Sequence, residues 1–129
     1  MITASDVATA LRQNPYQSYN SLLKSKVSSS LKTTSLNSSA TSYGNHYEDE
    51  ARELFSTRFN LDTWEIGLFQ HSDYTWLGGS PDGIASDGNL IEIKCPVTRE
   101  ISHSIPKHYY PQVQICMEIL DIPFCYFIQ

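Results

Sequence analysis

Apolar residues recur at helical spacing in three stretches of the chain. This spacing predicts a helix over residues 4–13, a second over 45–58 and a third over 109–120. The first helix has Thr3 or Ser5 as a candidate N-cap. The third helix turns an apolar side inward, formed by Val113, Cys116, Met117 and Leu120.

Strand-like runs occupy much of the remaining sequence. Residues 64–69 alternate loosely, residues 71–73 form a turn, and residues 74–77 return as a second strand. A further hairpin combines residues 83–85 with residues 90–95.

A final apolar run over residues 124–128 predicts a last strand that is buried on both faces. The predicted order is therefore helix, long loop, helix, three strands arranged as hairpins, helix and strand. Such a mixture indicates a domain of the α/β class.

Ser, Thr and Asn dominate the segment over about residues 24–44. Few apolar side chains are available there to offset the entropy of ordering the chain. We therefore predict a mobile surface loop, which acts either as a lid or insertion beside a binding groove or as a plain spacer.

The composition is that of one compact globular domain spanning residues 1–129, with 40% hydrophobic and 12% aromatic residues. No apolar run approaches membrane-spanning length and no charged-then-apolar leader is present, so we expect no membrane span or secretory signal. Three cysteines without paired spacing indicate a reducing, intracellular compartment, either cytoplasm or nucleus.

The sequence around Ser86, Asp87 and Gly88 reads as the turn of the second hairpin. A two-residue loop would set Asp82 opposite Ile93 and place Glu92 on the other face of the sheet. A three-residue loop with Gly88 in the left-handed conformation would instead set Asp82 opposite Glu92. We predict the three-residue loop, because only this register brings the two acids together.

Two carboxylates facing each other across a strand pair can bind one hard cation such as Mg²⁺ or Mn²⁺. Without a cation they repel each other. Lys94 returns to the same face as Glu92 and can hold or help deprotonate a water. The backbone carbonyl of Ile93 and several waters are plausible remaining ligands, and a cation there would polarise a phosphodiester.

The spacing from Ser80-Pro81-Asp82-Gly83 to Glu92-Ile93-Lys94-Cys95-Pro96 resembles the PD-(D/E)XK nucleases, specifically the phage lambda exonuclease and YqaJ-type viral recombinase branch. Further matches follow the family's order over nearly the whole chain. They are Ile2-Thr3-Ala4-Ser5-Asp6, the stretch from Gly44 to Phe55, and Tyr109-Tyr110-Pro111-Gln112-Val113-Gln114.

The resemblance implies a restriction-endonuclease-like αβββαβ core, in which a mixed central sheet is flanked by helices. It also implies catalytic roles for five residues, with Glu48 acting on the metal through water. Thr3 and Ser5 would hold a terminal DNA phosphate. The five implied catalytic residues are Glu48, Asp82, Glu92, Lys94 and Gln112.

Several of these residues have structural explanations that local sequence leaves open. Thr3 and Ser5 could be ordinary helix caps, and Glu48 could serve the helix macrodipole. Gln112 could be a solvent-facing polar residue of its helix. Trp64, Tyr74 and Trp76 could stack on bases, but we expect them to pack in the core or on a sheet face.

The resemblance implies Mg²⁺-dependent hydrolysis of DNA, as a 5′ to 3′ exonuclease on double-strand ends in viral or phage recombination or repair. A single-strand-annealing recombinase would be its partner, and the family's ring-shaped trimers make a homo-oligomer an expectation. The alternatives are a non-catalytic module that binds DNA ends or a recombination partner, and an endonuclease of the same fold.

Three features depart from this pattern. The net charge is −5, so DNA contacts would have to come from a local cluster such as Lys94, Arg99 and Lys107. The family's upstream basic helix has no room before Met1. Relatives also continue past the last apolar strand, so we expect a truncated or minimal version of the fold.

Overall fold

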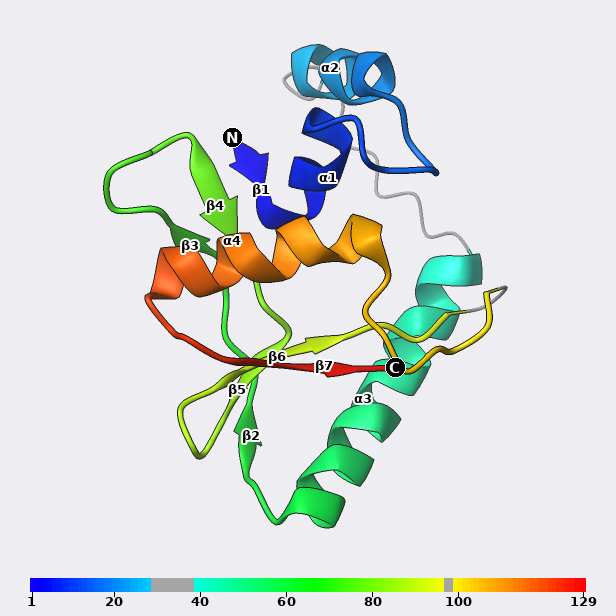
Figure 1. Cartoon of the computed structure of the whole chain (residues 1–129), viewed down its shortest axis with the longest axis vertical. Helices are drawn as coiled ribbons and strands as arrows, with labels where there is room; N and C mark the ends of the chain where they lie inside the picture. Colours follow the sequence, from blue (N-terminus) through cyan, green and yellow to red (C-terminus); the bar gives the residue numbers. More distant parts are fainter. Residues whose placement is uncertain (29–38, 97–98) are drawn as a thin grey trace.

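The computed structural model describes residues 1–28, 39–96 and 99–129. Its larger sheet has the strand order β2-β5-β6-β7. Strand β6 pairs antiparallel with β5 and parallel with β7, so the sheet is mixed, as predicted (Figure 1). The strands are β2 (Thr63–Trp64), β5 (Gly83–Ala85), β6 (Leu90–Ile93) and β7 (Cys125–Ile128).

A smaller sheet has the order β1-β4-β3. Strand β1 runs parallel to β4, whereas β3 and β4 form an antiparallel hairpin. The N-terminal segment therefore adds a strand to a hairpin that lies far along the sequence. The strands are β1 (Ile2–Thr3), β3 (Phe69–Gln70) and β4 (Leu77–Gly79).

Helices cover both faces of the larger sheet, which confirms the predicted α/β class (Figure 1). Helix α4 (Tyr110–Leu120) follows a 3-10 turn, η2 (Lys107–Tyr109), and packs on one face, while α3 (Ser39–Phe59) packs on the other. The remaining helical elements are η1 (Ala4–Asp6), α1 (Val7–Ala10) and α2 (Tyr19–Ser28).

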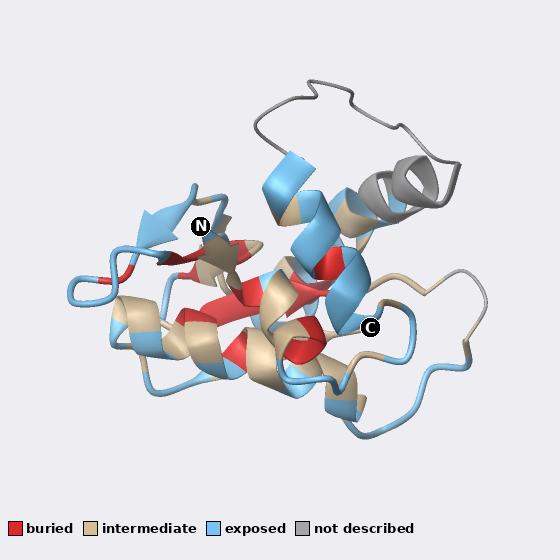
Figure 2. Ribbon diagram, turned by 90° about the horizontal axis from the view of Figure 1, so that it is seen from above, coloured by how far each residue is buried: buried red, intermediate tan, exposed pale blue. Residues whose placement is uncertain are grey.

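The core lies on both faces of β6, whose four residues are all buried (Figure 2). Leu90 and Ile91 are both 0% exposed. Ile91 packs in a cluster with Phe55 of α3, whereas Leu90 packs with Cys116 of α4. Since successive strand side chains point to opposite faces, Glu92 is directed to the α4 side.

Helix α3 begins at Ser39, six positions before the predicted start. Helix α2 extends to Ser28. The predicted loop is therefore wrong at both ends, and its middle, residues 29–38, lies outside the described residues. Helix therefore forms at both ends of this segment despite the weak helix propensity of Ser, Thr and Asn.

Strand β7 and three aromatic side chains are more exposed than the sequence predicted. Strand β7 lies at an edge of its sheet and is only partly buried, not buried on both faces. Trp64, Tyr74 and Trp76 are 53%, 55% and 58% exposed, so the expectation of core or sheet-face packing is wrong.

Gly78 and Gly79 of β4 are both buried. A Cβ on Gly79 would lie 3.1 Å from Ile119 Cδ1 and 3.2 Å from Cys116 Sγ. The close approach therefore serves the packing of β4 against α4.

None of the helices in the described ranges combines the length and apolarity that crossing a bilayer requires.

Candidate functional site

The turn between β5 and β6 is the three-residue loop that the sequence predicted. Ala85 N–H donates to Asn89 O at 2.8 Å, and Gly88 N–H donates to Ala85 O at 2.9 Å. Gly88 has a φ of 87°, in the left-handed region that favours glycine. The pairs Ile84–Leu90 and Gly83–Ile91 carry this register toward the site. Asp82 directly precedes β5, and its charge acts on Glu92 of β6.

The Asp82 and Glu92 carboxylates form the centre of the candidate site. Asp82 Oδ2 accepts a hydrogen bond from Ile93 N–H at 2.7 Å, which ties the strand before β5 to the end of β6. Glu92 is only 2% exposed. Burial and the neighbouring Asp82 raise the pKa of Glu92 from 4.5 to about 7, against the opposing effect of Lys94.

Lys94 and Gln112 both contact Glu92 through the same oxygen. Lys94 Nζ lies 3.3 Å from Glu92 Oε1, and Gln112 Nε2 donates to that oxygen at 3.0 Å. Gln112 comes from the first turn of α4, so the helix on this face completes the site. The interpretation of Gln112 as a solvent-facing helix residue is therefore wrong.

Glu48 approaches the site from α3. It is half-buried, and burial together with the charge of Asp82 raises its pKa, while Arg52 opposes the shift. Because α3 begins at Ser39, Glu48 lies well inside the helix and the macrodipole of the first turn does not explain it. The structure thus brings Glu48 within electrostatic reach of Asp82.

Arg52 is a residue of this region that the sequence reasoning missed. Its Nη2 lies 3.0 Å from Glu48 Oε1 and 3.8 Å from Glu65 Oε1. A Cβ on Gly83 would lie 2.6 Å from Arg52 Nη1, so the missing side chain makes room for the guanidinium. The spacing of four residues between Glu48 and Arg52 on one helix was the signal that could have revealed this pair.

The chemistry of these residues fits a small hard cation. The buried Glu92 and half-buried Asp82 carboxylates repel each other and supply oxygen ligands, which Mg²⁺ and Mn²⁺ prefer. In the described part of the chain no three His, Cys, Asp or Glu side chains are grouped to hold a metal. This is compatible with Mg²⁺, which is usually bound by one or two carboxylates and completed by waters and substrate phosphates.

Thr3 and Ser5, the expected phosphate-binding residues, lie together at the N-terminal 3-10 turn. Their hydroxyl oxygens are 3.0 Å apart, and the Thr3 hydroxyl donates to Asp6 Oδ2 at 2.8 Å. Asp6 also pairs with Lys26 Nζ at 2.7 Å. Ala4, between the two hydroxyl residues, packs against Cys116 of α4. The hydroxyls are therefore held beside α4 but make their hydrogen bonds within their own segment.

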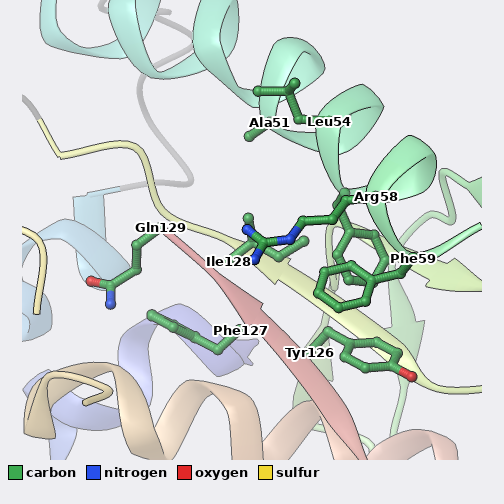
Figure 3. A pocket seen from close by; sticks show the side chains of 9 residues that line it. Ala51, Leu54, Arg58, Phe59, Tyr126, Phe127, Ile128 and Gln129 are labelled. Atoms are coloured by element: carbon green, nitrogen blue, oxygen red, sulfur yellow. The ribbon is translucent and has the colours of Figure 1, made fainter. Parts of the chain in front are cut away.

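A separate cavity of about 370 Å³ lies between α3 and β7 (Figure 3). Its lining is mainly apolar and contains Arg58 but no carboxylate. The lining side chains come from α3 and from the C-terminal segment that contains the edge strand β7. This cavity does not include the predicted catalytic residues.

A family model described as a YqaJ-like viral recombinase domain matches residues 1–122. An uncharacterised protein of Acanthamoeba polyphaga mimivirus is 30% identical over 146 residues, which cover 99% of this chain and 26% of the viral protein. A protein of African swine fever virus is 32% identical over 144 residues, which cover 88% of this chain and 41% of that protein. The chain thus spans less than half the length of these viral relatives.

Solved structures of an alkaline exonuclease are also similar to this chain. An alkaline exonuclease (LHK-Exo) from Laribacter hongkongensis has a TM-score of 0.81 and 30% sequence identity, and the match covers 98% of this chain and 66% of that chain. LHK-Exo in complex with dAMP also matches with a TM-score of 0.81 and 30% identity, over 98% of this chain and 67% of that chain.

Proposed function

This chain belongs to the YqaJ-like viral recombinase domain family, and we propose on that basis that it is a metal-dependent nuclease acting on DNA. The observation that carries the proposal is the buried Glu92 carboxylate close to Asp82, with Lys94 and Gln112 on the same Glu92 oxygen. The alkaline exonuclease structures support the same activity class.

Asp82, Glu92 and the Ile93 carbonyl would hold a Mg²⁺ or Mn²⁺ ion, which when bound supplies Lewis-acid polarisation of the phosphodiester and an acidified water. Lys94 holds the attacking water and stabilises negative charge at the phosphate oxygens. Gln112 orients the Glu92 carboxylate through its amide hydrogen bond. Glu48 acts through water, since its carboxylate is held back by Arg52.

We further propose degradation of double-stranded DNA from its ends in the 5′ to 3′ direction, in viral or phage recombination or repair. The exonuclease neighbours and the viral relatives support this assignment. Thr3 and Ser5 would receive the terminal phosphate. We expect a single-strand-annealing recombinase as its partner, and we expect the chain to assemble into a homo-oligomer.

Digestion of labelled DNA tests the proposal. Linear 5′-phosphorylated duplex and closed circular DNA are each incubated with the protein in Mg²⁺ or EDTA. The wild-type protein should release nucleotides from the linear duplex in the Mg²⁺ reaction and not in the EDTA reaction. Glu92→Gln should lower that rate at least about 100-fold, because it removes a charged ligand.

Glu53→Gln is the matched control, because Glu53 is an exposed glutamate of α3. It should digest DNA like the wild type. DNA that is bound but intact in every reaction would instead identify a non-catalytic module. Cutting of the closed circle would identify an endonuclease.

A further inference from the structure

Two cationic side chains contact the ring of Tyr109 beside the candidate site. Lys94 Nζ lies 4.8 Å from the ring centroid, and Arg99 Cζ lies 5.5 Å from it. Such distances are within the range of cation–π attraction, so the ring holds both cations in place. Tyr109 ends the 3-10 turn before α4, directly upstream of the helix that supplies Gln112.

Among the described residues, three nitrogen atoms near this ring lack a hydrogen-bond partner although they are buried from solvent. They are Arg99 Nε, Arg99 Nη2 and His108 Nε2. The only hydrogen bond of the Arg99 side chain in the described residues runs from Nη1 to Glu100 O at 3.3 Å. No ion pair within the described residues involves Arg99. Buried donors without acceptors are unfavourable, so an acceptor from outside the protein would satisfy them.

His108 contacts the same Tyr109 ring as the two cations. Its ring centroid lies 4.0 Å from that of Tyr109, and the Tyr16 ring contacts it edge-on at a centroid distance of 5.3 Å. Burial, Arg99 and Lys94 all lower the pKa of His108. The positive charges that act on His108 therefore converge on a single region, where an anion would relieve their mutual repulsion.

We propose that Arg99, His108 and Lys94, arranged around Tyr109, form a binding subsite for a DNA backbone phosphate adjacent to the scissile one. This inference rests on the proposed nuclease function. A guanidinium offers two parallel donors to a phosphate, and His108 adds a third donor in the tautomer that carries its hydrogen on Nε2.

The position of Lys94 is the reason for assigning a neighbouring phosphate. Its ammonium contacts Glu92 at 3.3 Å on one side and the Tyr109 ring on the other, so it joins the carboxylate pair to the subsite. A polymer with regularly spaced phosphates can occupy both places at once. The subsite residues Lys94, Arg99 and His108 come after β6 and before α4 in the sequence, whereas Thr3 and Ser5 belong to the N-terminal turn.

Equilibrium DNA binding tests the subsite without turnover. Fluorescence anisotropy with a labelled 5′-phosphorylated duplex is measured in EDTA at salt concentrations from about 50 to about 200 mM. Arg99→Gln should raise the Kd about fivefold or more and reduce the slope of log K against log salt by about 0.9, the loss of one phosphate contact. Arg99→Lys should keep the slope but weaken binding, because the charge remains and the fork is lost.

Arg58→Gln is the matched control, since Arg58 lines the α3–β7 cavity and not this subsite. It should leave both Kd and slope unchanged. An unchanged Kd and slope for Arg99→Gln, in a wild type that binds and digests DNA, would overturn the subsite and leave the nuclease standing. A wild type that neither binds nor digests DNA would overturn both. If Arg99→Gln does not fold, the same comparison is made between Arg99→Lys and Arg58→Lys, and equal Kd values would overturn the subsite.

Discussion

The two hairpins of the molecule, β3–β4 and β5–β6, differ in how their connections are held and in what they bury. The β5–β6 connection is a tight turn at Gly88 and leads into a strand buried along its whole length. The β3–β4 connection is held by the buried His71, whose Nδ1 accepts hydrogen bonds from Asp73 N–H and Tyr74 N–H at 3.0 Å. Tyr74 remains mostly exposed.

The difference between the two hairpins indicates where in the fold carboxylates can be shielded from water. Strands β5 and β6 each have partners on both sides, because β2 and β7 complete the sheet. Strand β3 instead lies at the edge of its sheet. A strand with two partners has a fixed register, so its side chains are assigned firmly to one face and an acid can be held in the interior.

The largest expected effect comes from matched Asp→Asn substitutions in the two hairpins. Asp82→Asn should lower the rate of DNA digestion in Mg²⁺ about 1,000-fold, because the remaining carboxylate cannot hold the cation as tightly. Asp73→Asn, in the exposed β3–β4 turn, should stay within about twofold of wild type. Comparable losses for both variants, measured under single-turnover conditions, would remove the functional distinction between the hairpins.

The stability of the metal-free protein should depend on pH through Glu92. Its pKa is raised from 4.5 to about 7 in the folded state, so between these values the folded protein binds more protons than the unfolded chain. Stability should therefore fall as pH rises through this window, by about 3 kcal/mol in the limit of an unperturbed unfolded state. Denaturant titrations in EDTA from about pH 4 to about pH 8 measure this change in the free energy of unfolding.

Glu92→Gln should remove most of this slope, whereas Glu118→Gln, beside His71 in the other region, should retain it. Adding Mg²⁺ at about pH 8 should restore stability to the wild type, because a cation favours the ionised pair. A slope that persists in Glu92→Gln would assign the titration to another group.

Glycine substitutions test the tight turn itself. Gly88→Ala should destabilise the fold by about 1 to 2 kcal/mol, since a φ of 87° is strained for alanine. Gly67→Ala is the control in the segment leading to β3, where an added Cβ would meet nothing within 4 Å and φ is not in the left-handed region. Equal unfolding free energies for the two variants would show that the turn tolerates a side chain.

The smallest effect is expected from Trp76→Ala. Trp76 is 58% exposed and contacts the Tyr74 ring at a centroid distance of 5.9 Å. Its loss should change stability by no more than about 0.5 kcal/mol, as for other surface substitutions. DNA digestion should stay near the wild-type rate. A large loss of DNA affinity in this variant would assign the exposed aromatics to substrate stacking.

Sequence reasoning succeeded where local chemistry decides the geometry. Gly88 and the residue alternation were enough to predict the three-residue turn and the register of the β5–β6 hairpin, because turn type fixes hairpin register. The predicted start of α3 was too late, because residues with poor helix propensity extend the helix when its later turns are packed. The true start also removes the macrodipole as the explanation of Glu48.

Contacts between distant segments could not be predicted in the same way. Nothing near Tyr109 in the sequence indicates that Lys94 and Arg99 would lie over its ring. The close approach of Arg52 to Gly83 depends on how α3 lies against the hairpin, and therefore on the whole fold. The exposure of Trp64 follows from the short outer strand β2, which the alternation pattern alone does not reveal.

The parallel strand β7 affects the order in which the site can be completed during protein synthesis. Lys94 N–H donates to Ile128 O at 2.8 Å, and Glu92 is paired in register with Phe127. The ribosome makes the two acids before it makes α4 and β7, so a nascent chain carries the reactive groups without the elements that hold them in place. If the chain cuts DNA, that capacity arises only after the late segments have left the exit tunnel.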